Sequence, residues 1–149
     1  MPEKETIRRA RKDKREGKAS STQAGEFVRE EIEHIRHGKH GARSTKQAIA
    51  IGLQKARRAG VKLPPPAKGT TSERTRESAV HAIEEGRAHK KPSARRSRAT
   101  REALKHEGHS AASPKALSRQ ASSAARRRSA ASRSEAAKKA AKTRKRTGH

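Results

Sequence analysis

Large apolar side chains are scarce in this chain, and most of them fall in one window. Ile, Leu, Val and Phe supply 14 of the 149 residues, and nine of these lie between Phe27 and Leu63. A chain this poor in large apolar residues and this rich in charge cannot bury enough surface to offset the entropy lost on folding. The expected fold class is therefore all-α with extensive disorder: one short αα-hairpin at about residues 20–63, plus weakly helical or disordered basic segments.

The first half of the window has the pattern of an amphipathic helix. Its apolar residues recur at three- and four-residue steps, which predicts a helix over residues 22–37 that ends at Gly38. Ser20 and Gln23 have the spacing of a capping box ahead of it. Acidic residues gather early in this helix and basic residues late, an order that suits the helix dipole.

The second half of the window predicts a partner helix that begins at Ser44 and ends at Gly60. Ala48, Gly52 and Ala56 recur every fourth residue, so another helix can approach this face closely. The first helix is acid-rich and the second carries no acid, which favours antiparallel packing. The predicted hairpin core consists of Phe27, Val28, Ile32, Ile35, Ile49 and Leu53. We expect so small a core to need self-association or a ligand for stability.

The remaining chain divides by composition into four segments. Residues 1–19 form a charged N-terminal segment, expected to be a solvated helix with no apolar stripe to dock it. Residues 64–71 are a Pro-rich linker, and residues 72–90 predict a weak helix. Residues 91–149 form a basic arm rich in Ala, Ser, Arg and Lys. Within this arm, residues 100–128 align with the hairpin as a degenerate second copy, although biased composition alone also explains the match.

The net charge of +25 points to a polyanion as partner, because such a charge repels itself unless something neutralises it. The arm carries 18 basic and 3 acidic residues, whereas residues 1–43 carry 12 and 8. Nucleic acid is the expected partner, with DNA favoured over RNA. The chain offers one Phe and no Tyr or Trp to stack on bases, so we expect contacts mainly to phosphate.

The expected phosphate contacts lie in the loop before the second helix, on that helix, and along the arm. They are Lys39, Arg43, Lys46, Lys55, Arg57, Arg58, Arg95, Arg96, Arg98, Arg126, Arg127, Arg128, Lys138, Lys139, Lys142, Arg144, Lys145 and Arg146. For the second helix, the alternative is an ordinary solvated face that answers the acidic first helix. The phosphate-docking interpretation is favoured there because no acid occurs between Arg36 and Glu73.

Three histidines, His34, His37 and His40, have spacing that can bind Zn²⁺ or Ni²⁺. We expect no metal, because Gly38 interrupts the helix between them and the chain has no Cys to complete a tetrahedral set. No nucleophile-elbow, P-loop or dinucleotide-binding motif is present. The chain is expected to be no enzyme, with no cofactor and no small-molecule substrate.

Two resemblances accompany these patterns. Residues 20–66, which include Gln23–Ile32, His37–Leu53 and Lys55–Val61, resemble a family of small, basic bacterial proteins of unknown function. The Ala136–Lys142 tract is similar to the Lys/Ala-rich tails of linker histones and bacterial histone-like proteins. The second resemblance implies DNA coating or compaction.

The leading hypothesis is a non-enzymatic, largely sequence-independent DNA-binding protein of the histone-like kind. It would lie in the cytoplasm, on the nucleoid, with no membrane partner and with self-association through the hairpin. One alternative is an RNA-binding or ribosome-associated protein, because phosphate contacts suit both polymers. Others are a hydrophilic stress-response protein, and an interaction module whose hairpin binds a protein.

Overall fold

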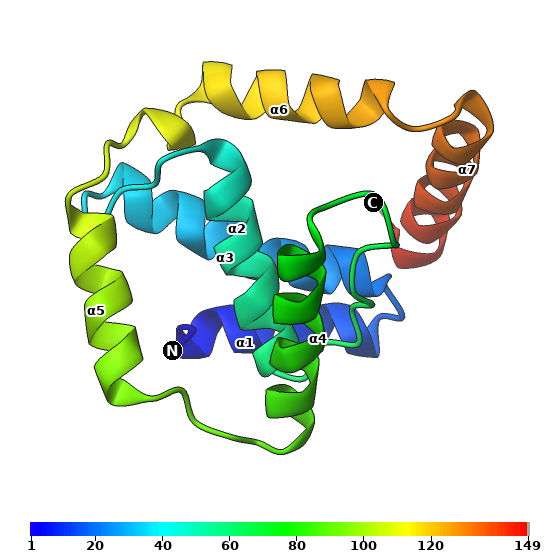
Figure 1. Cartoon of the computed structure of the whole chain (residues 1–149). Helices are drawn as coiled ribbons and strands as arrows, with labels where there is room; N and C mark the ends of the chain where they lie inside the picture. Colours follow the sequence, from blue (N-terminus) through cyan, green and yellow to red (C-terminus); the bar gives the residue numbers. More distant parts are fainter. Residues whose placement is uncertain (149) are drawn as a thin grey trace.

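The amphipathic window folds into two antiparallel helices. The structure, a computed structural model, describes residues 1–148. Helix α2 (Ser20–Arg36) and helix α3 (Thr45–Arg58) are each followed, two residues after their last residue, by a positive-φ glycine, Gly38 and Gly60 respectively. Because Gly52 carries no side chain, the two helices meet closely: its nearest neighbours are backbone atoms of Phe27 and Val28. These helices form the αα-hairpin at the centre of the molecule (Figure 1).

The charged N-terminal segment also docks on this hairpin. Helix α1 (Lys4–Arg15) packs against α2, and it buries Thr6, Ala10 and Asp13. These three positions recur at four- and three-residue steps, so they share one face of the helix. The expectation of a solvated helix without a docking stripe is therefore wrong: these small and polar residues are buried, and the partly buried Ile7 packs against the Phe27 cluster.

Two small apolar clusters hold the hairpin and its neighbours together. Phe27 packs with Ala10, Ala24 and Ala56 at one end. Ile32 and Ile35 pack with small residues of α3 and of the later chain at the other end, where Val28 and Leu117 are partly buried. Leu53 is partly buried against the first cluster. Ile49 is only partly buried and belongs to neither cluster within the described residues.

Helix α4 (Glu73–Arg87) follows the Pro-rich linker in the chain and packs against α3. Ala79, Ala82 and Gly86 are its buried residues. Gly86 allows the closest approach, because a Cβ there would lie 2.3 Å from the carbonyl oxygen of Arg57. Small residues, rather than large apolar ones, thus build this second helix–helix interface.

The last third of the chain is helical as well. Helix α5 (Ala94–Lys105), the 3₁₀ turn η1 (Ser110–Ala112), α6 (Pro114–Arg126) and α7 (Ala130–Thr147) run around the outside of α1–α4 (Figure 1). Ala111 and Ala112 pack into the Ile32–Ile35 cluster. In residues 1–148, α5 and α6 do not lie side by side as a second hairpin over 100–128.

The expectation of extensive disorder is wrong, because all segments described as weakly helical or disordered contain formed helices. The all-α part of the expectation is confirmed. Apolar burial was the wrong criterion for the arm, since Ala-rich segments have high helix propensity. In addition, Ser72, Ser93, Ser113 and Ser129 each accept a backbone hydrogen bond at the start of a helix.

Helix starts differ from the expected capping boxes in one of two cases. Ser44 caps α3 as predicted, accepting from the backbone N–H of Gln47 at 3.2 Å. Ser20 instead lies inside α2, and Ala19 occupies the N-cap without a side-chain bond. The Gln23 side chain donates to the carbonyl of Lys18 at 2.9 Å, so it ties α2 to the preceding turn.

Candidate nucleic-acid interface

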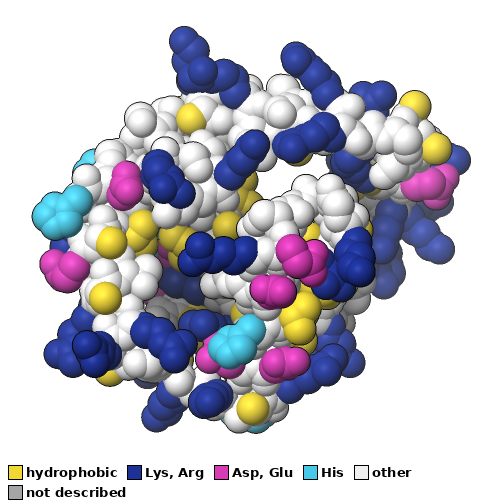
Figure 2. Space-filling view, in the orientation of Figure 1, with side chains coloured by type: hydrophobic (Ala, Val, Ile, Leu, Met, Phe, Trp, Pro, Cys, Tyr) yellow, Lys and Arg dark blue, Asp and Glu magenta, His cyan; other side chains and the backbone are white. Residues whose placement is uncertain are grey.

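The basic arm presents its cations to solvent. Every Lys and Arg side chain in α5, α6 and α7 is exposed, and neither α6 nor α7 contains a fully buried residue. Figure 2 shows these side chains gathered along α6 at the top of the molecule, over α7 beside it and around α5. The arm therefore forms an open surface of one dominant charge sign rather than a pocket.

The expected phosphate contacts of the arm fall into three groups on this surface. Arg95, Arg96 and Arg98 lie in the first half of α5. Arg126–Arg128 end α6 and lead into α7. The contacts on α7 itself are Lys138, Lys139, Lys142, Arg144, Lys145 and Arg146.

The start of α7 and the preceding turn enclose an open depression. It is lined by Arg128, Ser132, Glu135, Ala136, Lys138, Lys139 and Lys142. Arg128 donates to the carbonyl of Ser132 at 3.0 Å, which holds its guanidinium against the helix. Four of the lining residues are cationic and one is acidic, so the depression suits a phosphate group.

The C-terminal end of α7 contacts the N-terminal unit, by which we mean α1, α2, α3 and the turns between them. Arg146 donates to the carbonyl oxygen of Glu16 at 2.6 Å, and its guanidinium lies beside Gly17. One of the expected phosphate contacts is thus already engaged with the protein backbone. The contact also brings the far end of the arm back to the turn between α1 and α2 (Figure 1).

The cations of α3 are placed differently from those of the arm. Lys55 points inward, where its ammonium pairs with Glu30 at 3.1 Å and with Glu31. Arg57 is buried, its pKa is lowered by desolvation, and it donates to the carbonyl of Pro64 at 3.1 Å. Lys55 is thus partly buried and Arg57 buried, and both are engaged with groups of the protein itself.

Two further cations near the hairpin have acidic partners. Arg58 pairs with Glu85 of α4 at 2.8 Å, and Lys39 pairs with Glu3 at 3.0 Å. Arg43 and Lys46 remain exposed. The sequence gap without acids was misleading, because the neutralising carboxylates come from α2, from α4 and from the N-terminus. Lys55 and Arg58 therefore face acidic neighbours, while phosphate contacts at Arg43 and Lys46 stay a prediction.

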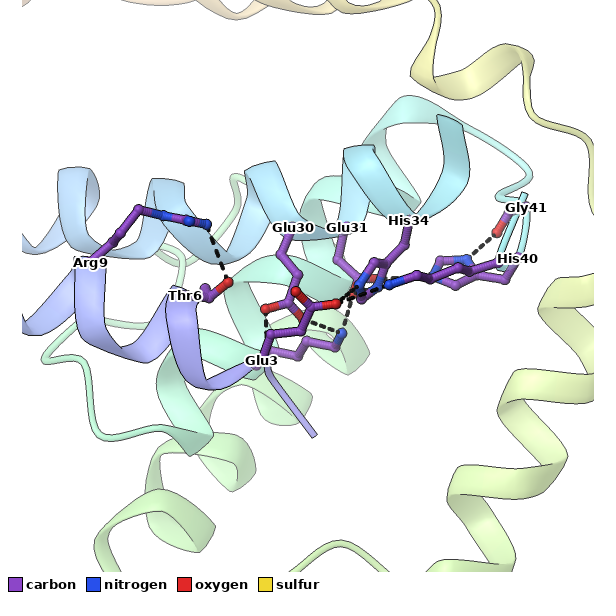
Figure 3. A network of polar contacts seen from close by, with 10 residues as sticks. Glu3, Thr6, Arg9, Glu30, Glu31, His34, His40 and Gly41 are labelled. Atoms are coloured by element: carbon purple, nitrogen blue, oxygen red, sulfur yellow. Dashed lines mark hydrogen bonds and ion pairs between the residues drawn. The ribbon is translucent and has the colours of Figure 1, made fainter. Parts of the chain in front are cut away.

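A polar network, buried at Glu30 and Glu31 and exposed at Glu3, lies between α2 and the start of α1 (Figure 3). Glu31 is 1% exposed, and both His34 and His40 face its carboxylate. Glu3 reaches the same place from the N-terminus of α1 and accepts from His34 at 2.8 Å. His37, in contrast, is exposed and outside the network. Sequence reasoning missed Glu3 and Glu31, although the i,i+3 spacing of Glu31 and His34 was a usable signal.

Two carboxylates of this network, Glu3 and Glu30, have lowered pKa values. Hydrogen bonds from His34 and then Lys39 lower the pKa of Glu3 to about 2. Burial raises the pKa of Glu30, but hydrogen bonds from the Glu3 backbone, Thr6 and Lys55 outweigh it and leave the pKa below its usual value. Glu30 is thus held as a carboxylate inside the protein, whereas Glu3 is held as a carboxylate at its surface.

Comparison with known proteins found a family match for the N-terminal part of the chain. Residues 4–68 match the model of a family described as a family of unknown function (DUF6496). The matched region holds α1, α2, α3 and most of the Pro-rich linker, and it contains the polar network except Glu3. No curated protein and no solved structure matches the chain.

The match agrees with the resemblance of residues 20–66 to a family without an assigned activity. It ends before the arm, so the likeness of Ala136–Lys142 to histone tails stays a prediction. Separately, none of the helices within residues 1–148 is long and apolar enough to cross a membrane.

Proposed function

We propose that this chain is a non-enzymatic DNA-binding protein that contacts phosphates through its arm, residues 91–149. The observation that carries the proposal is the exposure of the arm's cations, together with 18 Lys and Arg against 3 Asp and Glu. A phosphate polymer bound there would release its condensed counterions, which supplies affinity without a shaped pocket.

The internal ion pairs of the molecule support the arm as the binding element. Lys39, Lys55 and Arg58 have carboxylate partners outside the arm, whereas the arm itself has few carboxylates to pair with its cations. A positive field that the protein does not neutralise attracts a polyanion. The bound DNA would therefore lie along α5, α6 and α7.

The binding would be largely independent of sequence. Lys and Arg contacts to phosphate position a protein on the duplex but read no base edges. Under this proposal the protein is histone-like in its chemistry and lies on the bacterial nucleoid. The N-terminal unit would hold the arm in place.

Salt dependence is the direct test of this proposal. We would measure the affinity of the full chain for two double-stranded DNAs of unrelated sequence by fluorescence anisotropy at several salt concentrations. The log–log slope should be about −0.9 for each phosphate neutralised, with similar affinities for both sequences. A slope near zero would refute phosphate binding, and a strong preference for one sequence would refute the sequence-independent mode.

A charge-matched pair of variants locates the interface. The first replaces Arg126, Arg127 and Arg128 by Gln; the control replaces the exposed residues Lys4, Arg11 and Lys14 of α1 by Gln. Both lose three charges, but only the first should reduce the slope by roughly 2–3. Equal effects would show that net charge alone matters. A parallel titration with double-stranded RNA separates the two polymers, since tighter RNA binding would favour the ribosome-associated alternative.

A further inference from the structure

Three metal-ligating side chains converge in the N-terminal unit. One ligand atom each from Glu31, His34 and His40 lies within 4.8 Å of the others. His34 Nδ1 is 3.7 Å from Glu31 Oε1, and His40 Nε2 is 3.4 Å from Glu31 Oε2. Ligands about 2.0–2.1 Å from a tetrahedral ion lie about 3.3 Å apart, so the two imidazole–carboxylate distances are close to those around a bound ion.

The outer nitrogen of each imidazole already has an acceptor. His34 Nε2 lies 2.8 Å from Oε1 of Glu3, and His40 Nδ1 lies 2.9 Å from the carbonyl oxygen of Gly41. A carboxylate and a carbonyl only accept, so each outer nitrogen carries the proton. Metal-binding histidines have this arrangement, in which the second nitrogen donates to a carboxylate or a carbonyl.

In the neutral imidazoles, the inner nitrogens therefore point lone pairs at the carboxylate of Glu31. Facing lone pairs repel one another in a buried place, and either a proton on a ring or a metal ion between the groups removes this repulsion. The surrounding charges also favour a cation: besides the imidazoles, the three carboxylates of Glu3, Glu30 and Glu31 pair with two ammonium groups, those of Lys39 and Lys55, among the described residues.

The end of helix α2 before Gly38 creates this arrangement rather than preventing it. Gly38 has φ 71°, a left-handed conformation that turns the chain back. His40 thereby returns to face His34, with ring centroids 6.0 Å apart and ring planes nearly perpendicular. Glu31 takes the place that the sequence pattern had offered to His37.

The geometry points to a divalent transition-metal site, with Zn²⁺ as the preferred ion and Glu31, His34 and His40 as ligands. Two imidazoles and a carboxylate suit Zn²⁺ better than Mg²⁺ or Ca²⁺, which prefer oxygen ligands. Binding through Oε2 of Glu31 leaves Oε1 to Lys55. His34 and His40 are 13% and 11% exposed, which gives an ion access from solvent. The site is independent of the proposed DNA-binding surface.

Titration calorimetry of the metal-stripped full chain with ZnCl₂ tests the site. We expect one saturable high-affinity site per chain, a rise in Tm with Zn²⁺, and no comparable binding of MgCl₂. Stripped protein with Co²⁺ should show the intense visible absorption of a tetrahedral complex. Absence of saturable Zn²⁺ binding at one equivalent would overturn the proposal.

Matched histidine variants assign the ligands. His40→Asn should weaken Zn²⁺ binding by more than the roughly 10–100-fold typical of losing an outer partner. Glu3→Gln, which alters only such a partner, should fall within that range. His37→Asn is the control, because this neighbouring histidine is exposed and outside the cluster. Equal affinity in His40→Asn and the native chain would overturn the assignment, as would a loss in His37→Asn.

Ring-nitrogen NMR of the native chain decides the matter even if His40→Asn fails to fold. Addition of one equivalent of Zn²⁺ should shift Nδ1 of His34 and Nε2 of His40. The rings of the exposed His37 and His109 should stay unchanged. Shifts confined to exposed histidines would show that Zn²⁺ binds elsewhere and would overturn the proposal.

Discussion

Gly52 of α3 lies directly against the backbone of Val28 in α2. A Cβ atom at Gly52 would lie 2.6 Å from Val28 Cα, closer than carbon atoms of packed helices approach. Ala48 and Ala56, one turn away on either side, are fully buried. The hairpin therefore depends on a row of small residues that brings the two backbones together.

Gly52→Ala should destabilise the protein by about 1–3 kcal/mol, because the added methyl forces two backbones apart. Urea unfolding followed by circular dichroism measures the change. Gly25→Ala on α2 is the matched control, since a Cβ there meets nothing within 4 Å. That control should stabilise the protein by about 0.5–1 kcal/mol through helix propensity. Destabilisation of equal size in both would contradict the close-approach argument.

Phe27 should be the most sensitive apolar residue of the hairpin. It lies on α2, is 1% exposed, and packs against Ala10 of α1 and Ala56 of α3. Phe27→Ala should cost about 3–5 kcal/mol of unfolding free energy, owing to lost burial and the cavity left behind. Ile49→Ala removes a partly exposed side chain outside both clusters and should cost about 1 kcal/mol. Thermal unfolding of both variants would show whether the core lies where the structure places it.

The hairpin could be predicted because its signals are local or periodic. The apolar stripe of α2, the small-residue stripe of α3 and the glycines at the helix ends are all visible in sequence. The docking of α1 could not, because Thr6, Ala10 and Asp13 resemble a solvated face until their partners on α2 are known. The order of the arm was missed for a different reason, since helix propensity and serine caps, not apolar burial, decide it.

The sequence correctly predicts the exposure of the candidate interface's cations only for those that have no carboxylate partner from another helix. Cations of the arm remain exposed, as their segment composition indicates. Lys55 and Arg58 have acidic partners 24 to 27 residues away in sequence, on α2 and on α4. Pairing at this range depends on tertiary packing, so no window along the chain reveals it.

Lys55 is expected to contribute stability rather than DNA affinity. Lys55→Met leaves Glu30 and Glu31 buried without their ammonium partner, which should cost about 1–3 kcal/mol. Lys46→Met is the control on the same helix, because its side chain is exposed. It should change stability by less than about 0.5 kcal/mol. A Lys55→Met protein as stable as the native chain would contradict the buried ion pairs.

Gly41 should control how the arm is attached to the N-terminal unit. Its backbone N–H donates to the carbonyl of Leu104 at 2.8 Å, and the next residue, Ala42, donates to the carbonyl of Gly108 at 3.0 Å. A Cβ at Gly41 would lie 1.9 Å from the carbonyl oxygen of Glu107, which no side-chain adjustment can relieve. Gly41→Ala must therefore push the connection between α5 and η1 away from the hairpin.

The expected result is local detachment, measured by hydrogen exchange at residues 104–112. Protection there should fall in Gly41→Ala, while the amides of α1 and of the first half of α2 keep theirs. Gly108→Ala is the matched control on the other side of the contact, since a Cβ there meets nothing within 4 Å. Protection retained in Gly41→Ala, or lost equally in Gly108→Ala, would show that the arm is not held by this loop. Because the arm's cations are exposed independently of this contact, DNA affinity should change much less than protection.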